Sequence, residues 1–210
     1  MPNALILANG IPPSRETVAN SLRLASLFVC ADGGANVARG YGLTPHAIVG
    51  DLDSVTRETL ATFRSVPTIH NADEARTDAE KAVDWILARG GIDEITLLGA
   101  TAGRLDHVLG HLSLLIRYHD RVRVILEDDG LRALLAREAI TITQPPGTLL
   151  SFFAVGGAAE GVTTANLRYP LREHRLELGL QDSISNVVDA TPASILIARG
   201  TLLVVIMKNS

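Results

Sequence analysis

The chain has 210 residues, 47% of them hydrophobic, and a formal net charge of −4. This length fits one large domain or two small ones, with enough apolar material for a core. Basic residues form no dense block, which argues against an extended nucleic-acid-binding surface. Cys30 is the single cysteine, so no internal disulfide can form, and a buried structural thiol in a reducing compartment is expected.

Neither a leader nor a membrane span is expected from the sequence. The N-terminal stretch MPNALILANG lacks a basic start, and its apolar run is too short for a signal peptide. No apolar run approaches the roughly 20 residues that a membrane-spanning helix needs. The sequence therefore predicts a cytoplasmic protein that binds neither membranes nor nucleic acid.

Short apolar runs alternate with helical patterns up to about residue 127. The runs predict strands at residues 4–8, 27–31, 47–49, 68–70, 94–98 and 121–126. The clearest helical patterns cover residues 78–88 and 105–118. Several runs are β-branched and flanked by glycine, as buried parallel strands often are. The alternation predicts an α/β domain, residues 1–127, with a mostly parallel layered sheet.

The two helical patterns also predict boundaries and buried faces. Thr77 is a natural N-cap, and Glu80 three residues later completes a capping box. Gly90 and Gly91 are expected to end this helix. In the later helix the apolar spacing predicts a buried face made by Leu105, Val108, Leu109, Leu112 and Ile116.

From about residue 128 the pattern changes to short strand-like runs. They lie at residues 139–143, 149–155, 162–167, 194–198 and 202–207, separated by turn sequences such as QPPG, GGAAEG and DATP. No long helical period is evident. This pattern predicts a smaller all-β, sandwich-like domain, residues 128–210, which depends on packing against the first domain or a second subunit.

Three polar clusters follow apolar runs of the first domain: ADGGAN from Ala31, VGDLDS from Val49 and GATAGR from Gly99. The carboxyl ends of parallel strands meet at one edge of a sheet, where open α/β sheets bind ligands. The three clusters are therefore expected to form one ligand site at that edge.

The stretch VGDLDS is the strongest candidate for a cation site. Asp51 and Asp53 alternate like strand residues, so both carboxylates could face one side while Leu52 faces the core. Mg²⁺ prefers such oxygen ligands together with substrate phosphates. Asp78 is a candidate third carboxylate, although it could merely favour the helix dipole. A solvated turn, or a phosphatase of the haloacid-dehalogenase type with Asp51 as nucleophile, are the alternatives.

The glycine-rich turns are candidates for binding phosphate. Asp32, Gly33 and Gly34 could offer a carboxylate and exposed amides, or form a plain strand–helix turn. Neither a GxGxxG nor a Walker A pattern is present. Arg104, Asp106 and His107 are predicted at a helix N-terminus, where anions bind, although Asp106 could simply pair with its neighbours. A zinc site at His107 and His111 is disfavoured because no cysteine or HExxH pattern accompanies it.

An ordered set of stretches resembles the thiamine pyrophosphokinase family: CADGGAN, VGDLDS, RTDAEKAVDW, GATAGRLDHVLGHLSLL, LRYPL and SISN. The resemblance runs from about Cys30 to the C-terminus. The chain departs from the family pattern at Ala102, where a second glycine is common, and at His111, where asparagine is common. It also has Ser183 and Ile184 before the Ser-Asn pair, where the family usually has Gly-Leu or Gly-Ile.

The resemblance implies an α/β domain, a β-sandwich domain, and a homodimer with active sites between subunits. It implies Mg²⁺-dependent transfer of pyrophosphate from ATP to the hydroxyl of thiamine, with release of AMP. The residues implied for metal and phosphate chemistry are Asp51, Asp53 and Asp78, with Asp32 nearby and Arg104 steadying charge. Those implied for the nucleotide are Gly33, Gly34, Thr101, Arg104, Asp106 and His107, and those for thiamine are Ser185 and Asn186. A phosphatase and a non-catalytic nucleotide-binding module remain the alternatives.

Overall fold

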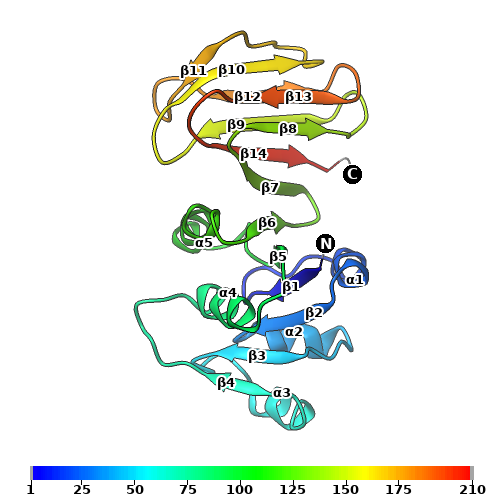
Figure 1. The fold of residues 1–210 in the computed structure, drawn as a ribbon. Coiled ribbons are helices and arrows are strands. Elements are labelled where there is room, and N and C mark those ends of the chain that lie inside the picture. The colour runs from blue at the N-terminus through cyan, green and yellow to red at the C-terminus, as the bar shows by residue number, and fades with distance from the viewer. Residues whose placement is uncertain (1, 209–210) are drawn as a thin grey trace. The chain divides into compact units, whose positions relative to one another are not determined.

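The computed structural model describes residues 2–208 of the chain (Figure 1). The chain divides into two compact units, Met1–Asp129 and Gly130–Ser210, where the sequence predicted a boundary between residues 127 and 128. Within residues 2–208, no helix has the length and apolar character needed to cross a membrane.

A six-stranded parallel sheet forms the centre of the first unit. Its strands are β1 (Asn3–Leu7), β2 (Leu27–Ala31), β3 (Ala47–Gly50), β4 (Thr68–His70), β5 (Glu94–Leu98) and β6 (Arg123–Glu127). They lie in the order β6-β5-β1-β2-β3-β4, and every neighbouring pair is parallel. The predicted strands are confirmed within two residues at their ends, and all except the largely exposed β4 are mostly buried apolar runs.

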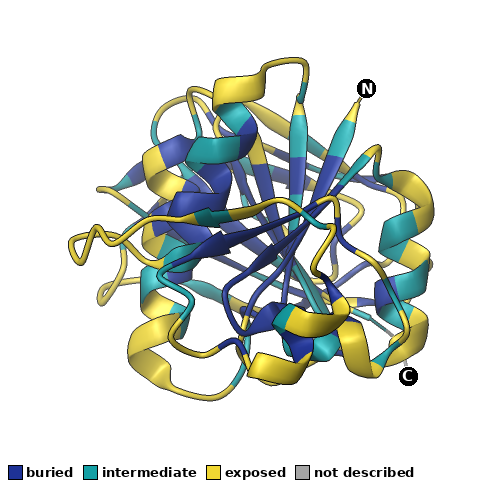
Figure 2. Ribbon diagram, turned by 90° about the horizontal axis from the view of Figure 1, so that it is seen from below, coloured by how far each residue is buried: buried dark blue, intermediate teal, exposed yellow. Residues whose placement is uncertain are grey.

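Helices cover both faces of this sheet. They are α1 (Arg15–Leu24), α2 (Gly34–Gly40), α3 (Arg57–Thr62), α4 (Asp78–Arg89) and α5 (Leu105–Tyr118). The first three pack on the face that carries Leu5, Phe28 and the buried Cys30, while α4 packs against β1–β3 and α5 against β6. Figure 2 shows the strands between these layers as buried and the outer faces of the helices as exposed. The predicted α/β layering is therefore confirmed.

Helix α4 begins and ends where its sequence predicts. The Thr77 side chain accepts a hydrogen bond from the N–H of Glu80, and the Glu80 side chain accepts one from the N–H of Thr77. This reciprocal capping box satisfies two N–H groups that the helix leaves open. At the other end, Gly90 has a φ of 72°, a conformation that glycine adopts without strain.

The predicted buried face of α5 is wrong in part: Val108 and Leu112 are half-buried, but the other three predicted residues are exposed. Leu105, Leu109 and Ile116 are exposed, with 71%, 55% and 42% of their surfaces accessible. The buried face consists instead of His111, Leu114, Leu115 and Tyr118. This helix has apolar residues around most of its circumference, so its spacing permits more than one stripe. The observed stripe includes the large Tyr118 ring, which is 1% exposed.

The second unit is built from two antiparallel sheets. Its strands are β7 (Leu131–Ala136), β8 (Ala139–Ile142), β9 (Leu149–Ala154), β10 (Ala159–Ala165), β11 (His174–Leu176), β12 (Ser183–Val187), β13 (Ala193–Leu196) and β14 (Leu202–Met207). One sheet has the order β12-β9-β14-β7 and the other β11-β10-β13-β8. The predicted all-β character is confirmed, while the sandwich-like packing of this unit stays a prediction.

Candidate active site

A cleft of about 820 Å³ lies at the carboxyl edge of the parallel sheet. Segments that follow β1, β2, β3 and β5 line it, together with the first turns of α4 and α5. From β1 the chain builds the sheet outward through β2, β3 and β4, and it then crosses back to place β5 on the other side of β1. Open α/β sheets bind ligands at such a switch point. The prediction that the polar clusters meet at one edge is confirmed.

Three carboxylates come together at one wall of this cleft. Oxygen atoms of Asp32, Asp51 and Asp78 all lie within 4.8 Å of one another. Asp32 is 2% exposed, and its Oδ1 has no hydrogen-bond partner anywhere in residues 2–208. Burial raises the pKa of Asp32, and the nearby carboxylates of Asp78 and Asp51 add to this effect. A buried oxygen without a partner, beside two more carboxylates, fits a hard cation such as Mg²⁺.

Asp53 is not part of this cluster, although it lines the same cleft. Strand β3 ends at Gly50, and Leu52 has a φ of 68°, so the predicted strand-like alternation of Asp51 and Asp53 is wrong. The left-handed turn lets Leu52 pack against the apolar core. It leaves Asp53 exposed, where its Oδ1 accepts a hydrogen bond of 2.8 Å from the Ser54 hydroxyl.

Lys81 is a buried cation in contact with the cluster, and it was not predicted from the sequence. Its Nζ lies 2.9 Å from Oδ1 of Asp78 and 3.5 Å from Oδ2 of Asp51. Burial lowers the pKa of Lys81, but the hydrogen bond and charge of Asp78, with those of Asp51, raise it by more. The spacing of three residues between Asp78 and Lys81 on a helix was the available signal.

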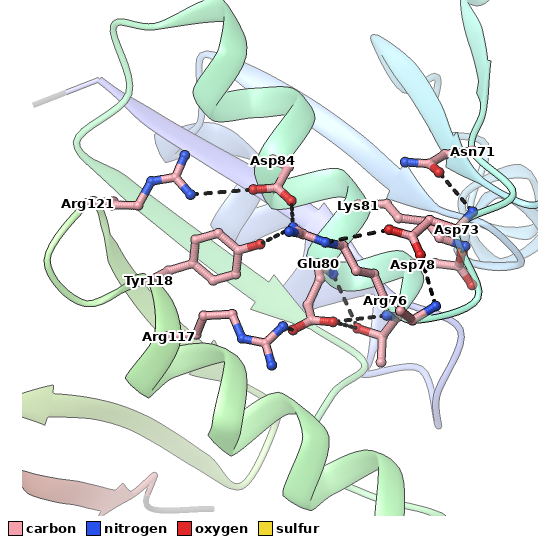
Figure 3. A network of polar contacts seen from close by, with 12 residues as sticks. Asn71, Asp73, Arg76, Asp78, Glu80, Lys81, Asp84, Arg117, Tyr118 and Arg121 are labelled. Carbon is pink, nitrogen blue, oxygen red and sulfur yellow. Dashed lines mark hydrogen bonds and ion pairs between the residues drawn. The ribbon is translucent and has the colours of Figure 1, made fainter. Parts of the chain in front are cut away.

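A network of ion pairs holds the start of α4, from which Asp78 projects (Figure 3). Arg76 contacts Asp84 in the middle of α4 and donates to the Tyr118 hydroxyl of α5 at 3.4 Å. Arg117 of α5 contacts Glu80 of the capping box. Burial, aided by the bond to Asp84, raises the pKa of Tyr118 to about 12. The network therefore ties the turn that carries Asp78 to a neighbouring helix.

Of the two glycines in ADGGAN, Gly34 packs against backbone atoms, whereas Gly33 packs against a side chain that can move. A Cβ atom on Gly34 would lie 2.0 Å from the carbonyl oxygen of Leu7, and one on Gly33 would lie 2.4 Å from the Asn9 side chain. Gly34 therefore lets α2 approach the end of β1 more closely than any residue with a Cβ could. Their predicted amide contacts with a nucleotide remain predictions.

The first turn of α5 places Arg104 and His107 at the cleft. Both are exposed, and Nη2 of Arg104 pairs with Oδ2 of Asp106 at 2.6 Å. This hydrogen bonding holds the pKa of Asp106 at about 2, so the ionised carboxylate offsets the charge of the arginine. The hydroxyl of Thr101 donates to Asp128 of the first unit.

His111 lines the inner part of the same cleft, one turn beyond His107. Its Nδ1 lies 2.9 Å from the carbonyl oxygen of Ala100, so this nitrogen carries the proton and donates. Burial is the main cause that lowers the pKa of His111, which favours the neutral ring. The ring thereby fixes the glycine-rich turn that follows β5.

Asn9 and Gly10 also line the cleft, and neither was predicted from the sequence as a site residue. A Cβ atom on Gly10 would lie 2.2 Å from the carbonyl oxygen of Gly99, so the turns after β1 and β5 are in close contact. An Asn-Gly pair directly after the first apolar run was the available signal. From sequence alone, this Asn-Gly pair is indistinguishable from an ordinary turn. Its place at the cleft follows only from the position of β1 between β2 and β5.

Ser185 and Asn186 lie on β12 of the second unit. Asn186 is 1% exposed, and its side-chain amide exchanges two hydrogen bonds with the backbone of Tyr169, of 3.1 and 2.8 Å. Ser185 is exposed with a φ of 57°, and its N–H donates to the Ser151 hydroxyl at 3.0 Å. Asn186 thus clamps a neighbouring loop, whatever contact either residue makes with a ligand.

Replacing Asn186 with alanine is expected to lower the free energy of unfolding by about 1–2 kcal/mol, because both backbone groups of Tyr169 lose their partner. Ser185→Ala on the same strand is the matched control, with an expected change within about 0.5 kcal/mol. Urea denaturation of the two variants measures the difference. Equal stabilities would contradict the role of Asn186 as a clamp.

The parallel sheet, the cleft at its switch point and the carboxylate cluster define an α/β protein with a ligand site suited to phosphate and a divalent cation. The family model described as "Thiamin pyrophosphokinase, catalytic domain" matches residues 18–126. A second model, "Thiamin pyrophosphokinase, vitamin B1 binding domain", matches residues 138–202. The chain belongs to the thiamine pyrophosphokinase family.

Individual relatives agree with this assignment. Thiamine pyrophosphokinase 1 of Arabidopsis thaliana is 31% identical over 192 residues, covering 78% of this chain and 72% of that protein. Thiamine pyrophosphokinase of Bacillus subtilis (strain 168) is 26% identical over 186 residues, covering 86% of each. The solved structure of the thiamin pyrophosphokinase from Candida albicans has a TM-score of 0.88 at 19% identity. It covers 99% of this chain and 89% of that chain, and shows the same fold.

Proposed function

We propose that this chain transfers the pyrophosphoryl group of ATP to the hydroxyl of thiamine, giving thiamine diphosphate and AMP. Family membership supports this reaction. The observation that carries the proposal within the structure is the cluster of Asp32, Asp51 and Asp78 at the ligand edge of the sheet. Its unpartnered Asp32 oxygen fits an oxygen-coordinated cation, which a triphosphate substrate brings with it.

The proposed transfer is an in-line displacement at the β-phosphorus. The thiamine hydroxyl oxygen forms a bond to this phosphorus, while the bond to the oxygen that bridges the α- and β-phosphates breaks. The bridging oxygen leaves with AMP, and the hydroxyl proton passes to Asp78 or to water. Positioning and electrostatic stabilisation supply most of the rate in such phosphoryl transfers.

Asp51 and Asp78, together with the buried Asp32, would hold Mg²⁺. Bound there, Mg²⁺ would neutralise phosphate oxygens and stabilise the charge that develops on them. Arg104 and His107 lie across the cleft opening on α5, where a guanidinium can leave Asp106 and grip a phosphate. Asp53 at the exposed side of the cleft is retained as a predicted ligand of the same ion.

The second unit is proposed to bind thiamine through Ser185 and Asn186, and to take part in a homodimer with active sites at the subunit interface. The family description of residues 138–202 as a vitamin B1 binding domain supports the first part. Large exposed apolar side chains, such as Leu180 and Ile184 near those residues, support a surface that is covered in use. The buried free thiol of Cys30 agrees with the proposed cytoplasmic location.

Incubation with ATP and Mg²⁺, with and without thiamine, tests the proposed function. AMP and thiamine diphosphate are expected to form in equal amounts, and only when thiamine is present. Omission of the divalent cation, with EDTA added, is the control and is expected to abolish both products. Release of inorganic phosphate without thiamine would indicate the phosphatase instead, and ATP binding without any product would indicate a non-catalytic module.

A further inference from the structure

Lys81 contacts two of the carboxylates at which a cation is proposed to bind, although it does not itself line the cleft. It is 3% exposed, and its ammonium bridges two carboxylates from different elements: Asp78 on α4 and Asp51 after β3. Figure 3 shows the Lys81 side chain running beside Asp78. An ion pair within α4 alone would join only Asp78, so the contact with Asp51 sets this lysine apart from ordinary helix pairs.

The choice of lysine is itself informative. Lys81 and Lys208 are the two lysines of the sequence, which otherwise uses arginine as its basic residue. An ammonium is a compact point charge on a flexible stem, whereas a guanidinium is a broad planar fork. A compact ammonium fits between two carboxylates much as a metal ion does. One of the two lysines of the sequence occupies this position.

The charges of the cluster show what this ammonium does. Three carboxylates within 4.8 Å repel one another strongly, and in a partly buried site this repulsion opposes folding. One ammonium leaves two formal negative charges, which a single divalent cation balances. Lys81 therefore reduces the repulsion among the carboxylates when no metal is bound. It also reduces the net negative charge that attracts a metal ion.

We propose that Lys81 is an internal counter-ion of the carboxylate cluster, which positions Asp51 and Asp78 before the divalent cation binds and competes with that cation for their oxygens. The inference rests on the proposed function only in taking this cluster as the cation site. Lys81 acts through the two carboxylates, so it is a positioning residue. Because ammonium and divalent cation are alternative partners, removing one must strengthen the binding of the other.

The test is direct binding of Mn²⁺ to the nucleotide-free, full-length protein and its Lys81→Met variant. Methionine keeps the length of the side chain and removes its charge. The variant is expected to melt at a lower temperature without metal, and to bind Mn²⁺ about tenfold or more tightly. It should also show a larger rise in melting temperature when Mn²⁺ is added. Free Mn²⁺ is counted by its EPR signal, and unfolding is followed by circular dichroism.

Three further variants keep the test decisive. Lys81→Arg retains the charge, and its Mn²⁺ affinity is expected to stay closer to that of the unmodified protein than the affinity of Lys81→Met does. If Lys81→Met does not fold, Lys81→Gln replaces it as the uncharged variant, and Lys81→Arg remains the charged comparison. Lys208→Met removes the other lysine, in the second unit, and is expected to change neither quantity.

Equal Mn²⁺ affinity in Lys81→Met and the unmodified protein would overturn the inference, as would weaker binding. Failure of the inference is distinguishable from failure of the proposed function. If the unmodified protein binds Mn²⁺ and makes AMP only with thiamine, an unaffected Lys81→Met variant refutes the counter-ion alone. If the unmodified protein binds no Mn²⁺, the counter-ion role falls, while the AMP assay still reports independently on the reaction.

Discussion

The Asp78→Asn variant is expected to lose about 10²–10³-fold in kcat/KM for thiamine diphosphate formation while remaining folded. Asparagine keeps the size of the side chain and an oxygen that can accept from Lys81, so the first turn of α4 should stay in place. The negative charge is lost at the point where three carboxylates converge. Steady-state measurement of AMP release, with circular dichroism to verify folding, checks this result.

Asp53→Asn is the matched comparison for Asp78→Asn. Both residues line the cleft and both substitutions remove one charge, but Asp53 lies outside the cluster. The geometry predicts a smaller loss for Asp53→Asn than for Asp78→Asn. An equal or larger loss would support Asp53 as a principal metal ligand, as the sequence pattern predicted. Near-normal activity of Asp78→Asn would refute the proposed cation site.

Local signals explain which parts of the fold could be predicted from the sequence. The capping box of Thr77 and Glu80 lies within four residues, and its geometry follows from helix chemistry alone. The buried strands are short apolar runs between glycine-containing turns, and neighbouring residues define them. For the same reason the residues after each strand could be assigned to one edge of the sheet before its strand order was known.

The composition of the carboxylate cluster depended on information that lies outside the local pattern. Period-two alternation predicts that Asp51 and Asp53 share a face, but the left-handed φ of Leu52 breaks the strand between them. Leu52 adopts this conformation because its side chain packs into the core formed with α1–α3. The place of Asp53 is taken by Asp32, which comes from the neighbouring strand β2.

Tertiary neighbours likewise decided the roles of α5 and Lys81. Helix α5 has more apolar residues than one face can bury, so the sheet, and not the helical period, selected Leu114, Leu115 and Tyr118. Lys81 looks like a surface residue of an amphipathic helix until Asp51 is brought next to it. Residues distant in sequence determine both the buried face of α5 and the contacts of Lys81. The sequence does not identify these residues unless the strand order of the sheet is known.

The Gly34→Ala variant is expected to be destabilised by about 3 kcal/mol or more, or to fail to fold. The added Cβ would lie 2.0 Å from the carbonyl oxygen of Leu7 and 2.8 Å from its carbon. Both are backbone atoms of β1, the central strand of the parallel sheet, so no flexible side chain can move aside. Urea denaturation measures the change, with soluble yield as the measure if the variant does not fold.

Gly40→Ala tests the same substitution at the other end of the same helix. Gly40 is exposed and has no atom within 4 Å of an added Cβ, so alanine is expected to be neutral or to stabilise α2 by up to about 1 kcal/mol. Opposite signs at the two ends would show that close packing on β1, and not helix propensity, requires glycine in ADGGAN. A Gly34→Ala protein as stable as Gly40→Ala would contradict this, and would leave a nucleotide contact as the remaining reason for that glycine.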